Sequence, residues 1–388
     1  MGLIRKVRNT LRHGGMSGLW QKANFRLGLV PPRGTETGRI CLRPFYYASI
    51  DPEARLTCCC AGWVKYSLGQ LSETKSLQDI WNGRVARSFR QAMLTTQLDR
   101  VCRSDICPYI IENQLPRLTA EGFEITPKAV GIFTADIIED PQILQAVTEK
   151  SRILDFAPKH LEIAVDSRCN LYCKSCRTNR ISRLSPDEER SVMLATQALK
   201  SAGKDLKILS LLSSGEVFFS RFSLDLLRRL NRREYPHLKV DVLTNGQLLD
   251  EKMWRYLGEG ADFIRFVSFS IDAAAGATYE QLRGGASWSR LLENMAFVQE
   301  LRAAGHLNSF TLNFVVSRQN FREMIDFVRL GDQFQVDGIM FTALLPWSMM
   351  TLDYQHDAVH LPEHPQHEEL REILSDPVFD LEWVTVGL

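Results

Sequence analysis

Between residues 161 and 346 the sequence alternates between short apolar runs and longer segments in which apolar residues recur at helical spacing. The apolar runs predict six strands, at 161–165, 207–212, 238–243, 263–271, 310–316 and 338–345. The segments between them predict helices at 186–202, 221–232, 250–258, 287–304 and 321–331. Strands that alternate with helices pair in parallel through right-handed crossovers, which defines an α/β fold. Because six β/α units are too few to close an eight-stranded barrel, we expect a partial (β/α)6 TIM-like barrel, curved and partly open.

All nine cysteines of the chain lie before residue 177, in two groups. The first group is Cys41, Cys58, Cys59, Cys60, Cys102 and Cys107, and the second is Cys169, Cys173 and Cys176. An odd number of cysteines at short spacings, in a chain in which we find no secretory signal, is not the pattern of a disulfide framework. The pattern indicates thiolates that bind metal or an iron–sulfur cluster in a reducing compartment, so we expect a cytoplasmic protein.

The second cysteine group has the spacing C-x3-C-x2-C and directly follows the first predicted strand. In barrels of parallel strands the ligands bind at the carboxyl ends of the strands, where this loop would lie. Three thiolates on a tight loop suit a [4Fe–4S] cluster, because the fourth iron stays free to chelate a small molecule. The alternative is zinc, but structural zinc takes four ligands, and the nearest histidine, His160, precedes the strand.

This loop and the motifs that follow it resemble the radical S-adenosylmethionine (SAM) superfamily over about residues 158–346. The later motifs, in order and each at the end of a predicted strand, are Ser213-Ser214-Gly215-Glu216, Thr244-Asn245-Gly246, and Ser268-Phe269-Ser270-Ile271-Asp272 with the following Thr278-Tyr279 and Arg283-Gly284-Gly285. The resemblance implies that Cys169, Cys173 and Cys176 hold a catalytic, SAM-ligating [4Fe–4S] cluster.

The resemblance also implies which residues bind SAM. Glu216 stands at the acid of the family's G-G-E motif, which binds the SAM ammonium group, with serine in place of the first glycine. Ser270 and Asp272 would lie near the ribose and the methionyl end, and Arg283 would pair with the carboxylate. The full set of expected SAM contacts is Tyr172, Ser214, Gly215, Glu216, Asn245, Ser270, Asp272, Arg283 and Asn313. The chain departs from the family at Ser175, where an aromatic residue usually stacks on adenine. Tyr172 or an apolar residue of the sixth strand would take over that contact.

The first cysteine group, with Leu68-Gly69-Gln70-Leu71 and Ile80-Trp81-Asn82 between its members, resembles a SPASM or shortened twitch module. Such modules bind auxiliary iron–sulfur clusters and normally follow the barrel, whereas here the module precedes it. Six thiolates allow one four-ligand [4Fe–4S] cluster with two cysteines left over. The expected ligands are Cys41, one of Cys58, Cys59 and Cys60, then Cys102 and Cys107. A structural zinc on the same four thiolates is the alternative.

These assignments divide the chain into five parts. They are a basic N-terminal segment (1–38), a small cysteine-rich α+β module (39–115), a linker (116–157), the radical SAM core (158–346) and a C-terminal extension (347–388). Residues 1–30 carry six basic and no acidic side chains, so they form either a loose terminus or a weak contact with an anionic membrane surface. The extension holds His356, His360, His364 and His367, which a metal site or a substrate contact would explain.

The formal net charge of +1 gives no reason to expect a nucleic-acid partner. The resemblance implies an enzyme that takes one electron from an external reductant such as a flavodoxin or ferredoxin. It would cleave SAM to a 5′-deoxyadenosyl radical, and that radical would abstract a substrate hydrogen atom. An auxiliary cluster that accepts an electron would make the net reaction an oxidation, as in an oxidoreductase.

Two alternatives to this function stay open at the level of sequence. The first is a peptide-modifying maturase, although the chain shows no resemblance to a leader-peptide-binding domain, which favours a small or carbohydrate-like substrate. The second is a non-catalytic iron–sulfur or zinc protein. Glu216 and the 268–272 strand end argue against a carrier, because a carrier needs no SAM pocket.

Overall fold

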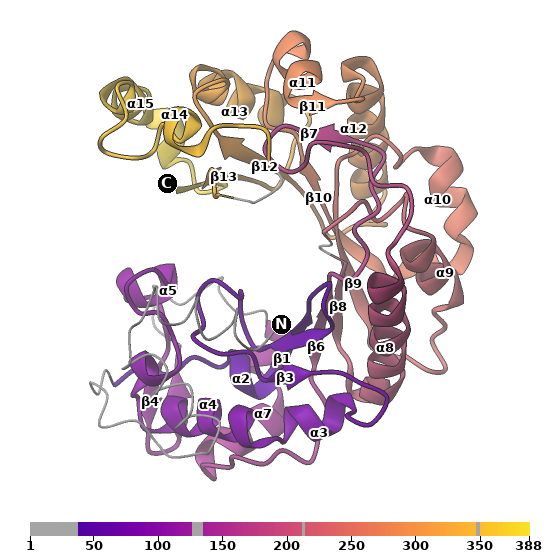
Figure 1. The fold of residues 1–388 in the computed structure, drawn as a ribbon, viewed down its shortest axis with the longest axis vertical. Helices are drawn as coiled ribbons and strands as arrows, with labels where there is room; N and C mark the ends of the chain where they lie inside the picture. The colour runs from indigo at the N-terminus through magenta and orange to yellow at the C-terminus, as the bar shows by residue number, and fades with distance from the viewer. Residues whose placement is uncertain (1–37, 126–134, 212–213, 347–349) are drawn as a thin grey trace, which may run out of the picture. The chain divides into compact units, whose positions relative to one another are not determined.

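The structure, a computed structural model, describes residues 38–125, 135–211, 214–346 and 350–388. The predicted basic N-terminal segment (1–38) lies outside the described residues apart from Gly38, and Ser213 lies outside them too. The chain divides into two compact units (Figure 1). As far as they are described, residues 1–162 and 193–207 form the first unit, and residues 163–192 and 208–388 form the second.

Parallel strands form the sheet of the second unit. In spatial order they are β8 (Ile208–Leu211), β9 (Lys239–Thr244), β10 (Ile264–Ser270), β12 (Ser309–Val316), β13 (Gly338–Ala343) and β14 (Val384–Gly387). The first five correspond to the second to sixth predicted strands, and the first predicted strand is β6 (His160–Ile163). The predicted α/β fold with a parallel sheet is therefore confirmed. Strand β14 is absent from the prediction, because only Val384 of its four residues is buried, so it lacks the apolar run that marks a strand such as β8.

Helices connect these strands. They are α8 (Pro186–Ala202), α9 (Arg221–Arg229), α10 (Glu251–Leu257), α11 (Gly276–Leu282), α12 (Trp288–Ala303) and α13 (Met324–Gln333), followed by α14 (Tyr354–Asp357) and α15 (His367–Leu374). Helix α12 begins where the sequence predicts, because the Ser287 side chain accepts a hydrogen bond from the backbone N–H of Arg290. Its buried stripe, which includes Leu291, Met295 and Val298, packs on β12, as α13 packs on β13.

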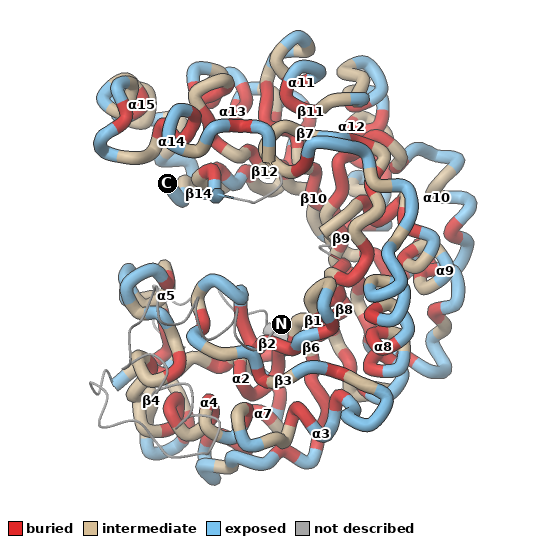
Figure 2. The backbone as a smooth tube through the Cα atoms, in the orientation of Figure 1, coloured by how far each residue is buried: buried red, intermediate tan, exposed pale blue. Residues whose placement is uncertain are grey.

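The two faces of the sheet differ in burial, and Figure 2 shows the burial of each residue along the chain. Along β12 the buried positions Phe310, Leu312 and Phe314 alternate with half-buried Thr311 and Asn313. Along β13 the fully buried Phe341 follows Met340, whose side chain is 42% exposed. Successive side chains of a strand point to opposite faces, so one face carries the aromatic core and the other is free for polar groups.

The first unit is a small α+β module. Its strands lie in the order β6, β1 (Tyr47–Ile50), β2 (Arg55–Thr57), β3 (Gly69–Gln70), with antiparallel pairs from β1 to β3. Its main helices are α2 (Arg43–Tyr46), α3 (Leu77–Trp81), α4 (Arg84–Leu94), α5 (Pro108–Ile111) and α7 (Pro141–Thr148). A capping box between Ser76 and Asp79 starts α3, which explains the helical pattern around Trp81. The predicted linker contains α7 and a hairpin of β4 (Arg117–Thr119) and β5 (Gly122–Glu124).

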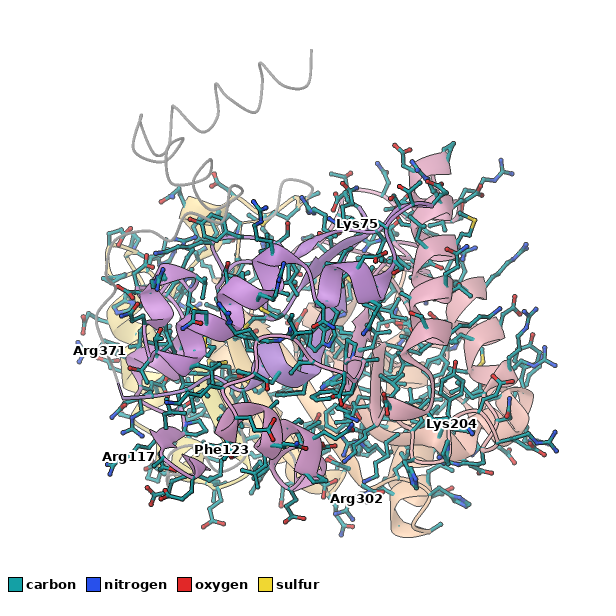
Figure 3. All side chains as sticks on the ribbon, turned by 90° about the horizontal axis from the view of Figure 1, so that it is seen from below. Lys75, Arg117, Phe123, Lys204, Arg302 and Arg371 are labelled. Carbon is teal, nitrogen blue, oxygen red and sulfur yellow. The ribbon has the colours of Figure 1, made fainter. Side chains whose placement is uncertain are left out.

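Charged side chains cover the described surface, as the exposed Lys75, Lys204 and Arg371 illustrate (Figure 3). The exposed pair of Arg329 with Asp326, at 2.7 Å, is of a kind that adds little to stability. None of the helices in the described part of the chain is long and apolar enough to cross a membrane.

Replacing Phe341 by alanine should lower the free energy of unfolding by about 3–5 kcal/mol, because a large buried ring is lost and a cavity remains. The ring contacts those of Phe314 and Phe327 at centroid distances of 5.3 and 5.9 Å. Met340→Ala, one residue away on the opposite face, is the matched control and should change stability by less than about 1 kcal/mol. Urea unfolding followed by circular dichroism measures both, and equal losses would contradict the assignment of the two faces.

Candidate functional site

The C-x3-C-x2-C loop is held in place by its backbone. Within it, β7 (Tyr172–Cys173) pairs antiparallel with β11 (Arg283–Gly284), and Cys173 lies opposite Arg283. The backbone N–H of Cys169 donates to the carbonyl of Ile181 at 2.9 Å, and that of Cys176 donates to the carbonyl of Cys173 at 3.0 Å. All three thiols are free. The loop that follows the first predicted strand therefore carries three free thiols, as the sequence predicts.

Each sulfur of this loop receives a hydrogen-bond donor. The Cys169 sulfur accepts from the Leu171 backbone N–H at 3.4 Å and from Asn245 Nδ2 at 3.9 Å. The Cys173 sulfur accepts from Arg283 Nη1 at 3.8 Å. Burial raises the pKa of the Cys173 thiol to about 11, and the charge of Arg283 opposes this rise. Donors aimed at sulfur stabilise the anionic thiolate, which is the form that binds metal.

Arg177 supplies the donor for the third sulfur, and the sequence analysis misses it. Its Nε donates to the Cys176 sulfur at 3.3 Å, Nη1 donates to the Ser167 carbonyl at 2.6 Å, and Nη2 donates to the Ser214 carbonyl. The guanidinium thereby ties the cysteine loop to the Ser214–Glu216 segment. Its place directly after the third cysteine is the one signal in the sequence that could have pointed to it.

Gly215 explains the close contact between these two segments. A Cβ atom at this position would lie 2.3 Å from the carbonyl oxygen of Arg168 and 2.5 Å from that of Asp166. The backbone N–H of Glu216 donates to the same Arg168 carbonyl at 2.8 Å. Only glycine leaves room for this approach. Beside it, Ser214 Oγ donates to the Ala164 carbonyl at 3.1 Å, which anchors the turn.

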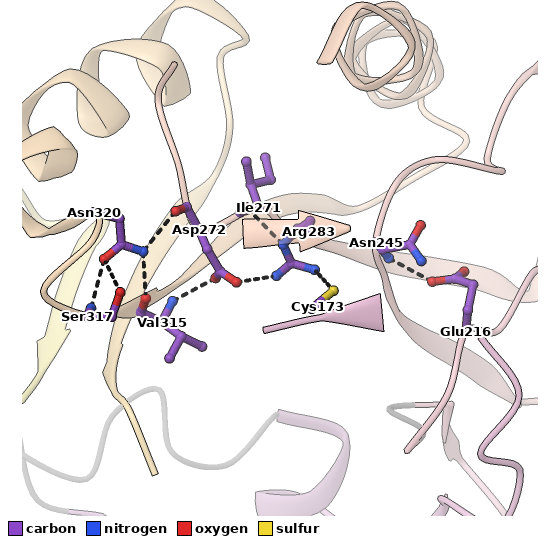
Figure 4. Close-up of polar contacts among 9 residues, drawn as sticks. All are labelled: Cys173, Glu216, Asn245, Ile271, Asp272, Arg283, Val315, Ser317 and Asn320. Atoms are coloured by element: carbon purple, nitrogen blue, oxygen red, sulfur yellow. Dashed lines mark hydrogen bonds and ion pairs between the residues drawn. The ribbon is translucent and has the colours of Figure 1, made fainter. Parts of the chain in front are cut away.

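The carboxylate of Glu216 is 1% exposed and accepts three hydrogen bonds. Thr244 Oγ1 donates at 2.6 Å, the Asn245 backbone N–H at 2.8 Å (Figure 4), and the Phe218 N–H at 3.1 Å. Burial raises the pKa of Glu216, and these donors oppose the rise. Because Asn245 also contacts the Cys169 sulfur, the structure brings Glu216, Asn245 and Cys169 together at the ends of neighbouring strands.

Asp272 and Arg283 form a buried ion pair at 2.7 Å (Figure 4). The second oxygen of Asp272 accepts from the Val315 backbone N–H at 2.8 Å, and Arg283 Nε donates to the Ile271 carbonyl at 2.9 Å. Burial by itself would lower the pKa of Arg283, but Asp272 and Cys173 raise it above the usual value. Both predicted SAM contacts thus have partners within the protein.

Ser270 and Asn313 are opposite each other in the register of β10 and β12. Both are half-buried on the polar face of the sheet, and Asn313 Nδ2 donates to Ser268 Oγ. Tyr172 is 47% exposed, and its ring lies against Gly284, where a Cβ would come within 2.3 Å of the ring. The R-G-G stretch therefore leaves space for the Tyr172 side chain of the cysteine loop.

Asn320 is a buried residue of this site that carries no recognisable signal in the sequence. Its Nδ2 donates to the carbonyls of Asp272 and Val315, both at 2.9 Å, and its Oδ1 accepts from the Ser317 N–H at 2.8 Å (Figure 4). Asp272 has φ +66°, a left-handed backbone conformation that side chains rarely adopt. Asn320 holds the strand end in that conformation.

In the first unit, five of the six cysteines line one apolar cavity, namely Cys41, Cys58, Cys59, Cys102 and Cys107. Cys60 is exposed and does not line it. Cys107 is the N-cap of α5, and the backbone N–H groups of Tyr109 and Ile110 lower its pKa against the larger effect of burial, which raises it. Burial raises the pKa of Cys41 to about 11 and that of Cys59 to about 12.

The cavity is also lined by a half-buried cation. Arg43 lines it, and the Nε of Arg43 is buried without a hydrogen-bond partner. Several thiols, backbone donors aimed at sulfur and a guanidinium fit an anionic group bound by thiolates, such as an iron–sulfur cluster.

Two family models match the chain. Residues 164–331 match the radical SAM superfamily, and residues 41–108 match the SPASM iron–sulfur cluster-binding domain. The chain carries a radical SAM domain preceded by a SPASM domain. The cofactors expected from the sequence are those of these domain families: SAM, a SAM-ligating [4Fe–4S] cluster and an auxiliary iron–sulfur cluster.

Curated relatives match this chain over about half of its length. The tungsten-containing aldehyde ferredoxin oxidoreductase cofactor-modifying protein of Pyrococcus furiosus is 24% identical over 52% of this chain and 55% of its own length. A "Probable GTP 3′,8-cyclase" of Saccharolobus islandicus is 24% identical over 55% of this chain and 62% of its own length. The chain thus spans less than two thirds of these relatives.

Among solved structures, Streptococcus suis SuiB bound to the precursor peptide SuiA has 18% sequence identity. The match covers 80% of this chain and 64% of that chain, with a TM-score of 0.43.

The C-terminal extension packs beside the cysteine loop. The Thr351 N–H donates to the Lys174 carbonyl at 2.8 Å. A ring nitrogen of His364 lies 3.0 Å from the His356 carbonyl, and one of His367 lies 3.2 Å from the Val359 carbonyl. These two histidines therefore hold the fold of the extension. Among the described residues of the extension, no three or more His, Cys, Asp or Glu side chains form a group that could hold a metal ion.

Replacing Gly215 by alanine should prevent the cysteine loop and the Glu216 segment from packing, because the new Cβ would overlap backbone carbonyl oxygens. We expect loss of the cluster of the radical SAM domain, measured as iron and sulfide per chain after anaerobic reconstitution. Gly338→Ala is the matched control, since its Cβ would meet its nearest atom, in Thr311, at an ordinary 3.5 Å. Equal iron in both variants would contradict the packing role of Gly215.

Proposed function

We propose that this protein is a radical SAM oxidoreductase that abstracts a hydrogen atom from its substrate and passes the surplus electron to an auxiliary cluster. The observation that carries the proposal is the arrangement around Cys169, Cys173 and Cys176. All three sulfurs have hydrogen-bond donors, and a buried carboxylate, Glu216, lies beside them at the strand ends. When bound, the cluster and SAM supply a 5′-deoxyadenosyl radical by one-electron cleavage of SAM.

In this proposal the three cysteines hold three irons of the cluster, and Arg177, Arg283 and the Leu171 N–H stabilise their thiolates. The carboxylate of Glu216 accepts hydrogen bonds from the SAM ammonium group. Support for this role comes from its hydrogen bonds with Thr244 and Asn245, which keep the carboxylate oriented.

The remaining predicted SAM contacts divide into three kinds in our proposal. Ser270, Asn313 and Tyr172 contact SAM directly, since their side chains are half-buried or exposed. Asp272 and Arg283 act through their ion pair, because each already uses the other as its main partner. Ser214, Gly215 and Asn245 shape the loop that receives SAM.

For the auxiliary cluster we propose Cys41, Cys102, Cys107 and one of Cys58 and Cys59 as ligands. All of these line the same cavity, whereas Cys60 is exposed and lies outside the lining. A cube takes four thiolates, so one cavity cysteine remains unligated.

We propose a small-molecule substrate. The supporting observation is that the two curated relatives are named for a cofactor modification and a GTP cyclisation. A peptide substrate, as in a maturase, is the alternative that mass spectrometry of reaction products distinguishes. We further propose that a flavodoxin or ferredoxin supplies the electron and that the protein acts in the cytoplasm, because all nine cysteines are free thiols.

The reconstituted wild-type protein should bind about eight irons per chain, on a count of four per cube, and should form 5′-deoxyadenosine from SAM with dithionite. Cys173→Ala should form none and retain about four irons. Cys60→Ala is the matched control and should behave like wild type. A protein that holds both clusters, binds SAM and still forms no 5′-deoxyadenosine would contradict the proposal.

Glu216→Gln should weaken SAM binding about 10- to 100-fold, because a charge-assisted hydrogen bond to the ammonium group is lost. Isothermal titration of the cluster-loaded protein measures the affinity. Asp326→Asn removes the same charge from an exposed position of α13 and should leave the affinity unchanged. An unchanged affinity in a correctly folded Glu216→Gln protein would remove Glu216 from the SAM site.

A further inference from the structure

Arg43 stands out among the residues that line the five-cysteine cavity because its charge has no acidic partner there. The lining contains five cysteines and otherwise mainly apolar and aromatic side chains, and none of its described residues is Asp or Glu. The Nε–H of Arg43 is buried and donates to no atom of the described protein. A buried, unsatisfied donor on a cation is costly unless an anion completes the site.

Two aromatic rings hold the Arg43 guanidinium. It lies 5.0 Å from the centre of the Tyr47 ring and 5.7 Å from that of Tyr109. Tyr47 is itself fixed, since its hydroxyl donates to Glu162 at 2.8 Å. Tyr109 follows Cys107 by two residues, and Arg43 follows Cys41 by two residues. Two proposed cluster ligands and the guanidinium are thus placed by the same short segments.

Arg90, which is fully buried, contacts the lining of the same cavity through Pro44. It is 0% exposed, and its hydrogen bonds to the carbonyls of Pro44, Trp81 and Arg152, each 2.9 Å long, go to neutral oxygens. Arg90 thus contacts Pro44 of the cavity lining, whereas Arg43 is itself part of that lining.

We propose that Arg43 is the counter-charge of the auxiliary cluster and raises its reduction potential. Reduction adds one electron to a group that is already anionic, moves no proton and breaks no bond. A fixed positive charge in a water-poor cavity stabilises the reduced state more than the oxidised state. In the proposed reaction the electron comes from the substrate radical, so this charge makes the auxiliary cluster an effective acceptor. The inference rests on the proposed function, since it requires a cluster at these cysteines.

The test uses the full chain in which Cys169, Cys173 and Cys176 are replaced by alanine, so that only the auxiliary cluster is loaded. A redox titration with dithionite, followed by electron paramagnetic resonance, gives its midpoint potential. Arg43→Gln should lower the ratio of reduced to oxidised cluster at least about tenfold at a given potential, a shift of about 59 mV for one electron. Arg43→Lys should restore most of the ratio, because the charge is kept.

Arg87→Gln is the matched control, since it removes the same charge from an exposed position of α4, the helix that carries Arg90. It should leave the potential unchanged. Equal potentials in wild type and Arg43→Gln would overturn the inference, and so would loss of the cluster from both Arg43 variants. If the cysteine-to-alanine background takes up no iron at all, the proposed auxiliary cluster itself is wrong, which is a separate result.

Discussion

Arg283 of β11 is buried, and its guanidinium contacts Asp272 and the Ile271 carbonyl, which follow strand β10, as well as the Cys173 sulfur. The same residue pairs through its backbone with the cysteine loop. The end of β10 and the cysteine loop are thus linked by the Arg283 side chain and by the backbone pairing of β11 with β7. Removing one partner of such a buried pair leaves an uncompensated charge, at a cost of about 3–5 kcal/mol. The position of Cys173 depends on this pair, because the guanidinium of Arg283 contacts the Cys173 sulfur and its backbone pairs with that of Cys173.

The two cysteine sites follow the same physical rule in different folds. In the radical SAM domain, Arg177 and Arg283 donate to sulfur directly. In the SPASM domain the backbone N–H groups at the start of α5 face Cys107, and Arg43 lies in the cavity. Thiolates are poorly tolerated in an apolar interior unless donors and positive charge surround them. The donors and positive charges around both cysteine groups would therefore stabilise an anionic cluster as well as the thiolates that bind it.

Much of this arrangement follows from local sequence. The strands of the α/β core can be predicted because short apolar runs alternate with segments of helical spacing. The start of α12 can be predicted because Ser287 caps it. Other parts leave no local trace. Strand β14 has a single buried residue, and Asn320 becomes part of the site only because its turn lies beside Asp272. In the sequence, nothing distinguishes Arg43 from other basic residues. Only the structure shows that its Nε is buried without a hydrogen-bond partner.

The sequence by itself determined the chemistry of this protein: three cysteines at C-x3-C-x2-C spacing, a second cysteine group ahead of them, and an α/β core whose strand ends carry polar motifs. These features are local, because spacing along one loop decides which sulfurs can share a cluster. Tertiary structure decided which groups surround the sulfurs. Arg283 reaches Cys173 across 110 positions of the chain, and Asn245 reaches Cys169 across 76. Such contacts depend on how strands and loops pack, and no periodicity in the sequence encodes them.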